Sequence, residues 1–232
     1  MEIVTTHRSP NFSDLVIPVE FVVVHYTACT LERTLEIFMD KATEVSSHLV
    51  IDSDGAVYEL VDCLNGDAKR AWHAGKSRYE AGRGSDRVLV EGFNDRSIGI
   101  ELVNLNGNVF SYTEAQYASL FSIIEVLKGL YPALQSPDAV VGHEQIAGFR
   151  GKCDPGRLFE WERLYSVCYP DQGSPQRRPM CSEATAERIR NLVTLLGVER
   201  DQGTGEVSLP KHLPSTFFGL LNSLCEGALS RE

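Results

Sequence analysis

The sequence predicts an α/β domain in which helices flank a central β-sheet, followed by a C-terminal extension of two helices. Two observations lead to this prediction. Apolar, β-branched runs of strand length alternate along the chain with segments whose apolar residues recur at helical spacing. The 232 residues, 43% of them hydrophobic, suffice for one domain of ordinary size with an appendage.

Composition and charge disfavour several classes of function. The formal net charge is −10 and the basic residues are not clustered, which argues against binding nucleic acid through its phosphates. No stretch reaches the roughly 18 apolar residues that suggest a membrane span. The first residues lack the basic-then-apolar pattern of a secretory signal, so we expect a cytoplasmic location, or a periplasmic one if a signal was removed. Six widely spaced cysteines are expected to be reduced thiols.

The first half of the chain is predicted to form a central strand, a helix and a hairpin. A β-branched and aromatic run predicts the strand, apolar residues at i, i+4, i+7 and i+8 predict the helix, and Asp-Gly between two apolar runs predicts the hairpin. These elements span residues 19–26, residues 31–39 with Thr30 as N-cap, and residues 47–52 and 56–61 around Asp54-Gly55. Residues 1–18 are expected to lie over the domain as an arm.

The segment from residue 71 to residue 164 is predicted to contain two more strands and two more helices. Its elements are a shaped loop at 71–75, a long surface loop at 76–94, a strand at 97–104, a helix from the capping box at Thr113 to about residue 129, a strand at 139–142 and a short helix at 158–164. Glu101 lies within the strand at 97–104. A carboxylate there is costly to bury unless it is paired or poised for chemistry.

The C-terminal part reads as a proline-containing linker and two amphipathic helices. We place the boundaries at residues 1–168 for the main domain, with its core at 19–165, at 169–181 for the linker and at 182–232 for the helical extension. Two helices of this size are too small to form a core alone. They are expected to pack on the main domain, on another copy of the chain or on a partner.

Candidate functional residues gather at strand ends and in shaped loops. His25 ends one strand, His143 follows another, and a glycine-rich loop then delivers Lys152, Cys153 and Asp154. Two histidines and one carboxylate leave an open position for water in a zinc site. Glu101 is a candidate general base, and Lys152 is suited to stabilise negative charge on a substrate oxygen.

Five segments in a fixed order, within residues 19–165, identify a family. They are His25-Tyr-Thr-Ala28, Ser46-Ser-His48 with Asp54-Gly55, Ala71-Trp-His-Ala-Gly75, Asn94-Asp-Arg-Ser-Ile-Gly-Ile-Glu-Leu102, and Gly142-His with Lys152-Cys-Asp-Pro-Gly156. Together they resemble the zinc-dependent N-acetylmuramoyl-L-alanine amidases of the AmpD/AmiD branch, which have the peptidoglycan-recognition-protein-like fold.

The resemblance implies a mixed β-sheet flanked by helices and a Zn²⁺ ion held by His25, His143 and Asp154. It implies hydrolysis of the amide between the lactyl group of N-acetylmuramic acid and L-alanine, in peptidoglycan or muropeptides. Glu101 would activate water and Lys152 would polarise the scissile carbonyl. The residues implied to contact the muropeptide are Trp72, His73 and Asn94.

Departures from the family pattern keep some alternatives open. The loop from His143 to Lys152 is one residue longer than in typical members, and Ser47 stands where phage-type relatives carry a tyrosine near the zinc. Some relatives use cysteine as the third ligand, but we favour Asp154 over Cys153. One alternative function is a non-catalytic peptidoglycan-binding module.

A second alternative is a cysteine amidohydrolase in which Cys29 or Cys153 pairs with a histidine, and sensitivity to chelators separates it from a zinc enzyme. The sequence also leaves open the oligomeric state and the choice between soluble 1,6-anhydro-muropeptides and polymeric peptidoglycan.

Overall fold

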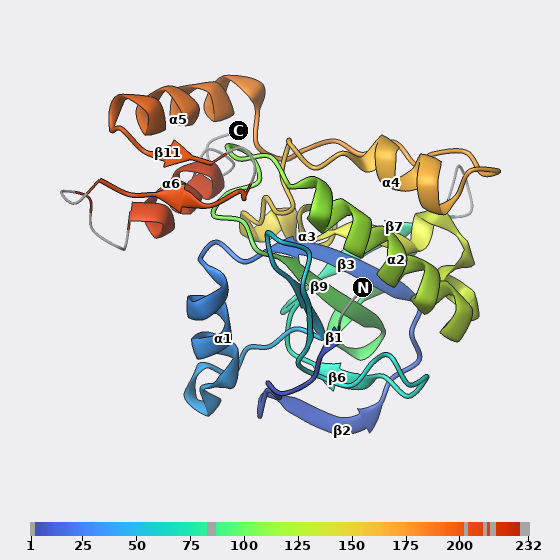
Figure 1. Cartoon of the computed structure of the whole chain (residues 1–232). Helices are drawn as coiled ribbons and strands as arrows, with labels where there is room; N and C mark the ends of the chain where they lie inside the picture. The colour runs from blue at the N-terminus through green and yellow to red at the C-terminus, as the bar shows by residue number, and fades with distance from the viewer. Residues whose placement is uncertain (1–2, 83–86, 202–203, 211–212, 214–216, 228–232) are drawn as a thin grey trace.

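The computed structural model describes residues 3–82, 87–201, 204–210, 213 and 217–227. Its centre is a six-stranded sheet in the order β1-β5-β4-β9-β3-β10 (Figure 1). The strands are β1 (Ile3–Val4), β5 (Val57–Glu59), β4 (Leu49–Ile51), β9 (Ser97–Leu102), β3 (Phe21–Tyr26) and β10 (Val140–Gly142). All neighbours pair in parallel except β4 and β5, which form the antiparallel hairpin. The predicted mixed α/β fold is confirmed.

The two central strands, β3 and β9, are buried along their whole length. Helix α2 (Glu114–Leu130) contacts α4 (Trp161–Cys168), and both cover one face of the sheet (Figure 1). The predicted capping box at Thr113 opens α2, and Thr30 caps α1 (Leu31–Met39), both as expected. Helix α4 begins three residues after the predicted start at residue 158.

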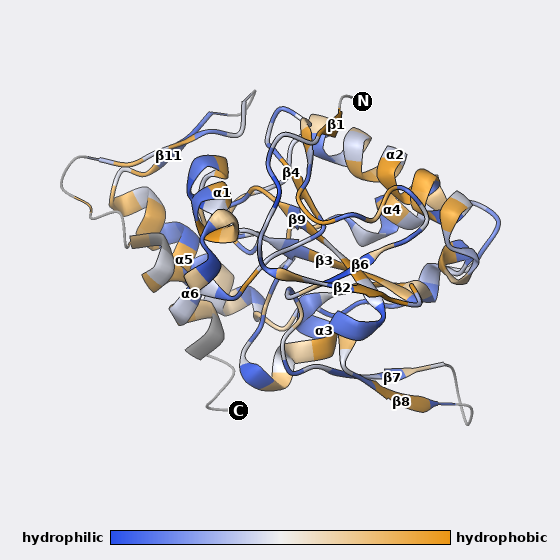
Figure 2. Ribbon diagram, turned by 90° about the horizontal axis from the view of Figure 1, so that it is seen from below, coloured by the Kyte–Doolittle hydropathy of each residue, from blue (hydrophilic) through white to orange (hydrophobic). Residues whose placement is uncertain are grey.

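Two predictions of irregular structure are wrong. Residues 1–18 supply β1 and also β2 (Phe12–Val16), which pairs with β6 (Lys69–Ala71). The predicted surface loop at 76–94 holds an antiparallel hairpin of β7 (Arg78–Ala81) and β8 (Val88–Glu91), which lies at one side of the molecule in Figure 2. The strands β2, β7 and β8 are mostly exposed. Their sequences therefore lack the alternation of apolar and polar residues that marks a half-buried strand.

The segment after β10 is helical rather than a simple loop. Helix α3 (His143–Ala147) begins directly after the strand, because the Gln145 side chain accepts a hydrogen bond from the N–H of Gly142, at 2.5 Å, and closes the first turn. Among the described residues of the main domain there are also five short 3₁₀ turns, at Lys41–Thr43, Phe93–Asp95, Pro132–Gln135, Pro137–Ala139 and Gly148–Arg150.

The C-terminal extension packs on the main domain. It consists of α5 (Glu183–Leu195), the hairpin of β11 (Glu199–Arg200) and β12 (Val207–Ser208), and α6 (Phe217–Gly227). Its buried residues share a second apolar cluster with four residues of the main domain, Leu105, Val109, Phe110 and Cys153. Among the described helices, none combines the length and the apolar character needed to cross a membrane. The boundaries at residues 168 and 181 stay predictions.

Candidate active site

The register of the parallel strands brings the candidate residues to one edge of the sheet. His25 on β3 pairs directly with Glu101 on β9. On the other side of β3, Gly142 of β10 pairs with Val24, so His143 emerges beside His25. The carboxyl ends of parallel strands are where α/β sheets place ligands.

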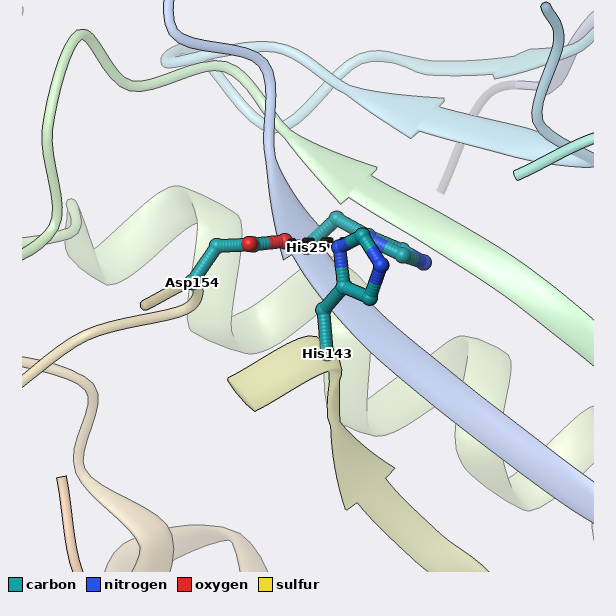
Figure 3. Close-up of side chains that lie close together, drawn as sticks. All are labelled: His25, His143 and Asp154. Carbon is teal, nitrogen blue, oxygen red and sulfur yellow. Dashed lines mark hydrogen bonds and ion pairs between the residues drawn. The ribbon is translucent and has the colours of Figure 1, made fainter. Parts of the chain in front are cut away.

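The two histidines and Asp154 converge on one point, although they come from three separate elements (Figure 3). The Nδ1 atoms of His25 and of His143 each lie 3.0 Å from Oδ2 of Asp154. One ligand atom from each residue lies within 4.8 Å of the other two, and all three residues are buried. Zinc–ligand bonds of about 2.0–2.1 Å in a tetrahedron place the ligand atoms about 3.3 Å apart, so this spacing fits a metal ion.

The protonation states of the cluster also suit a metal. Burial, with the neighbouring His143, lowers the pKa of His25 to about 4, so its imidazole is neutral at neutral pH. Burial opposes the charge of Asp154, but the imidazoles of His143 and His25 hold the pKa of that carboxyl well below its usual range. Metal ions bind neutral imidazole and ionised carboxylate, which are the forms of His25 and Asp154 at neutral pH.

Glu101 is a buried carboxyl group with one unsatisfied oxygen. Its Oε2 atom is buried and has no hydrogen-bond partner among the described protein groups. Burial, with the nearby charge of Asp154, raises the pKa of Glu101 to about 8. A buried acceptor that lacks a protein partner, beside a group of candidate metal ligands, is suited to hold a water or a substrate hydrogen.

A cavity of about 720 Å³ joins these residues and has the size of a small-molecule binding site. All eight residues predicted from the sequence line it: His25, Trp72, His73, Asn94, Glu101, His143, Lys152 and Asp154. The structure therefore brings together every predicted site residue.

The segment Trp72-His73-Ala74 forms one wall, and its polar atoms are turned largely toward the protein. Oδ1 of Asn94 accepts hydrogen bonds from the N–H groups of His73, at 3.1 Å, and Ala74, at 2.8 Å. The imidazole of His73 reaches His25, with 3.1 Å between Nδ1 of His73 and Nε2 of His25. Asn94 thus shapes the wall, and His73 contacts a candidate metal ligand.

Sequence reasoning missed several residues that line the cavity. Arg150 donates a 2.8 Å hydrogen bond to the carbonyl oxygen of Ala74, and Phe38 comes from α1. Asn222 comes from α6, where its Oδ1 accepts hydrogen bonds from the Tyr26 hydroxyl, at 2.9 Å, and from Asn106, at 3.0 Å. No local sequence signal marks Asn222, because its role depends on how the extension folds back.

The thiols do not form a cysteine–histidine pair within the described part of the chain. Cys29 Sγ contacts Thr34 Oγ1 at 3.2 Å, and Cys153 Sγ contacts the Tyr26 hydroxyl at 3.4 Å. A hydrogen bond with Cys225 and burial raise the pKa of Cys153, so its thiol stays protonated. Ser47, at the position of the phage-type tyrosine, donates to the carbonyl oxygen of Gly99 at 2.8 Å.

A mixed sheet that carries two imidazoles, an aspartate and a buried glutamate at the carboxyl edge of its parallel strands has the architecture of a metal-dependent hydrolase. The family model described as N-acetylmuramoyl-L-alanine amidase matches residues 16–157, and the chain belongs to this family.

Individual relatives agree with this assignment. A protein from Enterobacter cloacae named 1,6-anhydro-N-acetylmuramyl-L-alanine amidase AmpD is 41% identical over 123 residues, which are 53% of this chain and 57% of that protein. The chain therefore spans little more than half the length of such curated relatives. A crystal structure of a selenomethionine derivative of AmpD is 30% identical with a TM-score of 0.55, covering 71% of this chain and 93% of that one.

The structural similarity also reaches beyond the main domain. AmpDh3 from Pseudomonas aeruginosa, in complex with an anhydromuramic pentapeptide, is 25% identical with a TM-score of 0.55. That match covers 95% of this chain and 87% of AmpDh3.

Proposed function

We propose that this chain is a zinc-dependent N-acetylmuramoyl-L-alanine amidase that hydrolyses the amide between the lactyl group of N-acetylmuramic acid and L-alanine. The observation that carries the proposal is the convergence of His25, His143 and Asp154 beside the unsatisfied oxygen of Glu101, in one cavity. The names of the relatives support the substrate class, peptidoglycan fragments, because they specify a 1,6-anhydro-muramyl amidase and a bound anhydromuramic pentapeptide.

The donor set of the cluster fits Zn²⁺, which favours imidazole nitrogen and carboxylate oxygen. His25, His143 and Asp154 are the residues that would hold the ion. When bound, zinc would supply Lewis acidity that polarises the amide carbonyl and acidifies water.

The remaining steps are assigned to protein side chains. Glu101 in its ionised form accepts a proton from the attacking water, whose oxygen bonds to the carbonyl carbon. The ammonium group of Lys152 stabilises the negative charge that develops on the carbonyl oxygen. Glu101 then returns the proton to the alanine nitrogen as the C–N bond breaks, which leaves a lactyl carboxylic acid, with the second proton of the water on its new oxygen, and a free amine. Trp72 offers the muropeptide an apolar wall at the cavity.

A role in cell-wall recycling or remodelling belongs to the same proposal. The relatives named 1,6-anhydro-muramyl amidases support a preference for soluble anhydro-muropeptides and, with it, a cytoplasmic location. Rates on anhydro and reduced-end muropeptides test the preference, and fractionation of producing cells tests the location.

The central experiment is mass spectrometry of defined muropeptides incubated with native, chelator-treated and zinc-restored protein. The expected result is release of free stem peptide that stops after chelation and returns with zinc. Cleavage that persists after complete removal of zinc would overturn the metal mechanism. Binding of muropeptide by zinc-loaded protein without cleavage would instead favour the peptidoglycan-binding module.

A further inference from the structure

His73 lies between a candidate metal ligand and two oxygen atoms of Ser97. Its Nδ1 atom is 3.1 Å from Nε2 of His25, and its Nε2 atom is 3.3 Å from the Ser97 carbonyl oxygen and 3.4 Å from Ser97 Oγ. The ring planes of His25 and His73 are nearly perpendicular, at 87°, and the ring centroids lie 5.3 Å apart. This geometry suits an in-plane N–H of one ring pointing at the nitrogen of the other.

The surroundings of His73 decide which of its nitrogens carries the proton. The Ser97 carbonyl oxygen only accepts hydrogen bonds. Ser97 Oγ donates its single proton to the carbonyl oxygen of Phe93, at 2.5 Å, so toward His73 it also acts as an acceptor. Both oxygens near Nε2 of His73 therefore require an N–H there, and in a neutral ring this leaves Nδ1 as an acceptor.

The tautomer of His73 sets the tautomer of His25. Because Nδ1 of His73 accepts, Nε2 of His25 carries the proton, and the lone pair of His25 Nδ1 then faces Asp154. Two acceptors 3.0 Å apart repel each other unless a cation lies between them. We infer that His73 is a positioning residue that holds His25 in the metal-binding tautomer and in the orientation that binds Zn²⁺. This inference rests on the proposed function.

The strand beneath His73 is shaped to hold its ring. A Cβ atom on Gly99 would lie 2.5 Å from Cγ and 2.6 Å from Nδ1 of His73, so an alanine at this position would displace the ring. Gly99 itself is held by hydrogen bonds, since its N–H donates to Nδ1 of His48 at 3.0 Å and its carbonyl accepts from Ser47. The ring of His73 therefore packs directly against the backbone of Gly99.

The test is the affinity for zinc alone, measured by competition with a chromophoric chelator. Partners that orient a metal-binding histidine are typically worth about 10- to 100-fold in affinity, so we expect a loss of that size in His73→Leu. His73→Asn places Oδ1 where Nδ1 stands and keeps the acceptor. It is therefore expected to bind zinc at least about tenfold more tightly than His73→Leu. Gly99→Ala is expected to weaken zinc binding in the same direction without altering a ligand.

His48→Asn is the matched control, because His48 is a buried histidine whose ring lies 5.6 Å from that of His73 and which bonds to Gly99 and Lys69 rather than to His25. Its zinc affinity is expected to stay near the wild-type value. Imidazole ¹⁵N shifts of the zinc-loaded protein give a second readout, with the proton of His25 expected on Nε2.

Equal zinc affinities of His73→Leu and wild type would overturn the inference, as would equal losses in the Leu and Asn variants or a proton found on Nδ1 of His25. The outcome is separable from the amidase proposal. A protein that binds zinc in the expected order of variants but cleaves no muropeptide would sustain the inference and refute the proposed function.

Discussion

Replacing Glu101 by glutamine is expected to make the metal-free protein more stable and to slow catalysis by the zinc-loaded protein. Burial raises the pKa of Glu101 from 4.5 to about 8, so the folded state keeps a proton that the unfolded state releases. A carboxyl whose pKa is higher in the folded state stabilises least at high pH. Its favourable contribution is present below pH 4.5 and is lost as the pH rises toward 8. Glutamine has nearly the same shape and never ionises.

The size of the effect follows from the pKa difference. Each pKa unit corresponds to about 1.4 kcal/mol, so at pH 7 the carboxyl lowers the free energy of unfolding by roughly 3 kcal/mol relative to its protonated form. Most of this loss, about 2–3 kcal/mol, falls between pH 5 and pH 7. Glu101→Gln is therefore expected to have a free energy of unfolding roughly 3 kcal/mol above that of wild type at pH 7, and a much smaller advantage at pH 5.

Urea unfolding of both metal-free proteins at the two pH values measures this difference directly. Added zinc is expected to shrink it, because a nearby cation lowers the pKa of a carboxyl group. The zinc-loaded variant is expected to lose about 10²- to 10⁴-fold in kcat, the usual contribution of a general base. An identical pH dependence of unfolding in the two proteins would refute the reasoning about burial.

Glu144→Gln provides the matched control for Glu101→Gln. Glu144 is also buried, and burial also raises its pKa to about 8, but it does not line the cavity and accepts a hydrogen bond from the N–H of Met180. This variant is expected to share the gain in stability at pH 7 and to keep its amidase activity. A similar loss of activity in both variants would mean that Glu101 acts through the structure rather than as a base.

Three further substitutions separate the roles of the site residues. Asp154→Asn removes the anionic ligand and is expected to weaken zinc binding by at least about tenfold, measured by chelator competition. Lys152→Met is expected to lower kcat by about 10²- to 10³-fold with zinc affinity retained, measured by steady-state kinetics of stem-peptide release. Asn222→Ala, in α6, is expected to raise the KM for muropeptide several-fold, because about 1 kcal/mol of contacts at the cavity wall is lost.

Each of these predictions has an outcome that contradicts it. Full zinc affinity in Asp154→Asn would remove Asp154 from the ligand set, and a weakened zinc affinity in Lys152→Met would make that lysine a structural residue. For Asn222→Ala, the control is Ser223→Ala, an exposed neighbour on the same helix whose hydroxyl bonds only to Gly219 among the described residues. Equal KM values in the two variants would show that α6 does not contribute to substrate binding.

Local signals were enough to predict the elements that hold the candidate ligands. A β-branched strand, a capping box at Thr113 and Asp-Gly at a hairpin are short-range patterns, and each element formed where its pattern predicted it. The strand-end positions of His25 and His143 also follow from the sequence. Whether these histidines lie beside Glu101 and Asp154 depends on strand order and register. Only the resemblance to a family predicted that the four residues share one site.

The remaining features depend on contacts that no short window contains. The strands of the β7–β8 hairpin are largely exposed and carry charged residues, and for this reason the segment 76–94 was predicted to be a surface loop. The resemblance to the family implies that His73 contacts the muropeptide, and it does not reveal that the His73 ring bonds to His25, which is 48 residues away. Asn222 reaches the cavity only because α6 packs against the 105–110 segment.

The loop that carries Asp154, the third candidate ligand, packs against the C-terminal extension. Lys152 and Asp154 line the cavity, whereas Cys153 between them is buried in the apolar cluster that α5 and α6 share with the main domain. The Tyr26 hydroxyl contacts both Cys153 and Asn222, so the residue that follows His25 is tied to the same cluster. A metal ligand is held in place by the packing of its neighbours. The extension therefore stabilises the positions of two of the three candidate ligands, His25 and Asp154, through residues next to them in the sequence. It does so although a proline-containing linker separates the extension from the main domain.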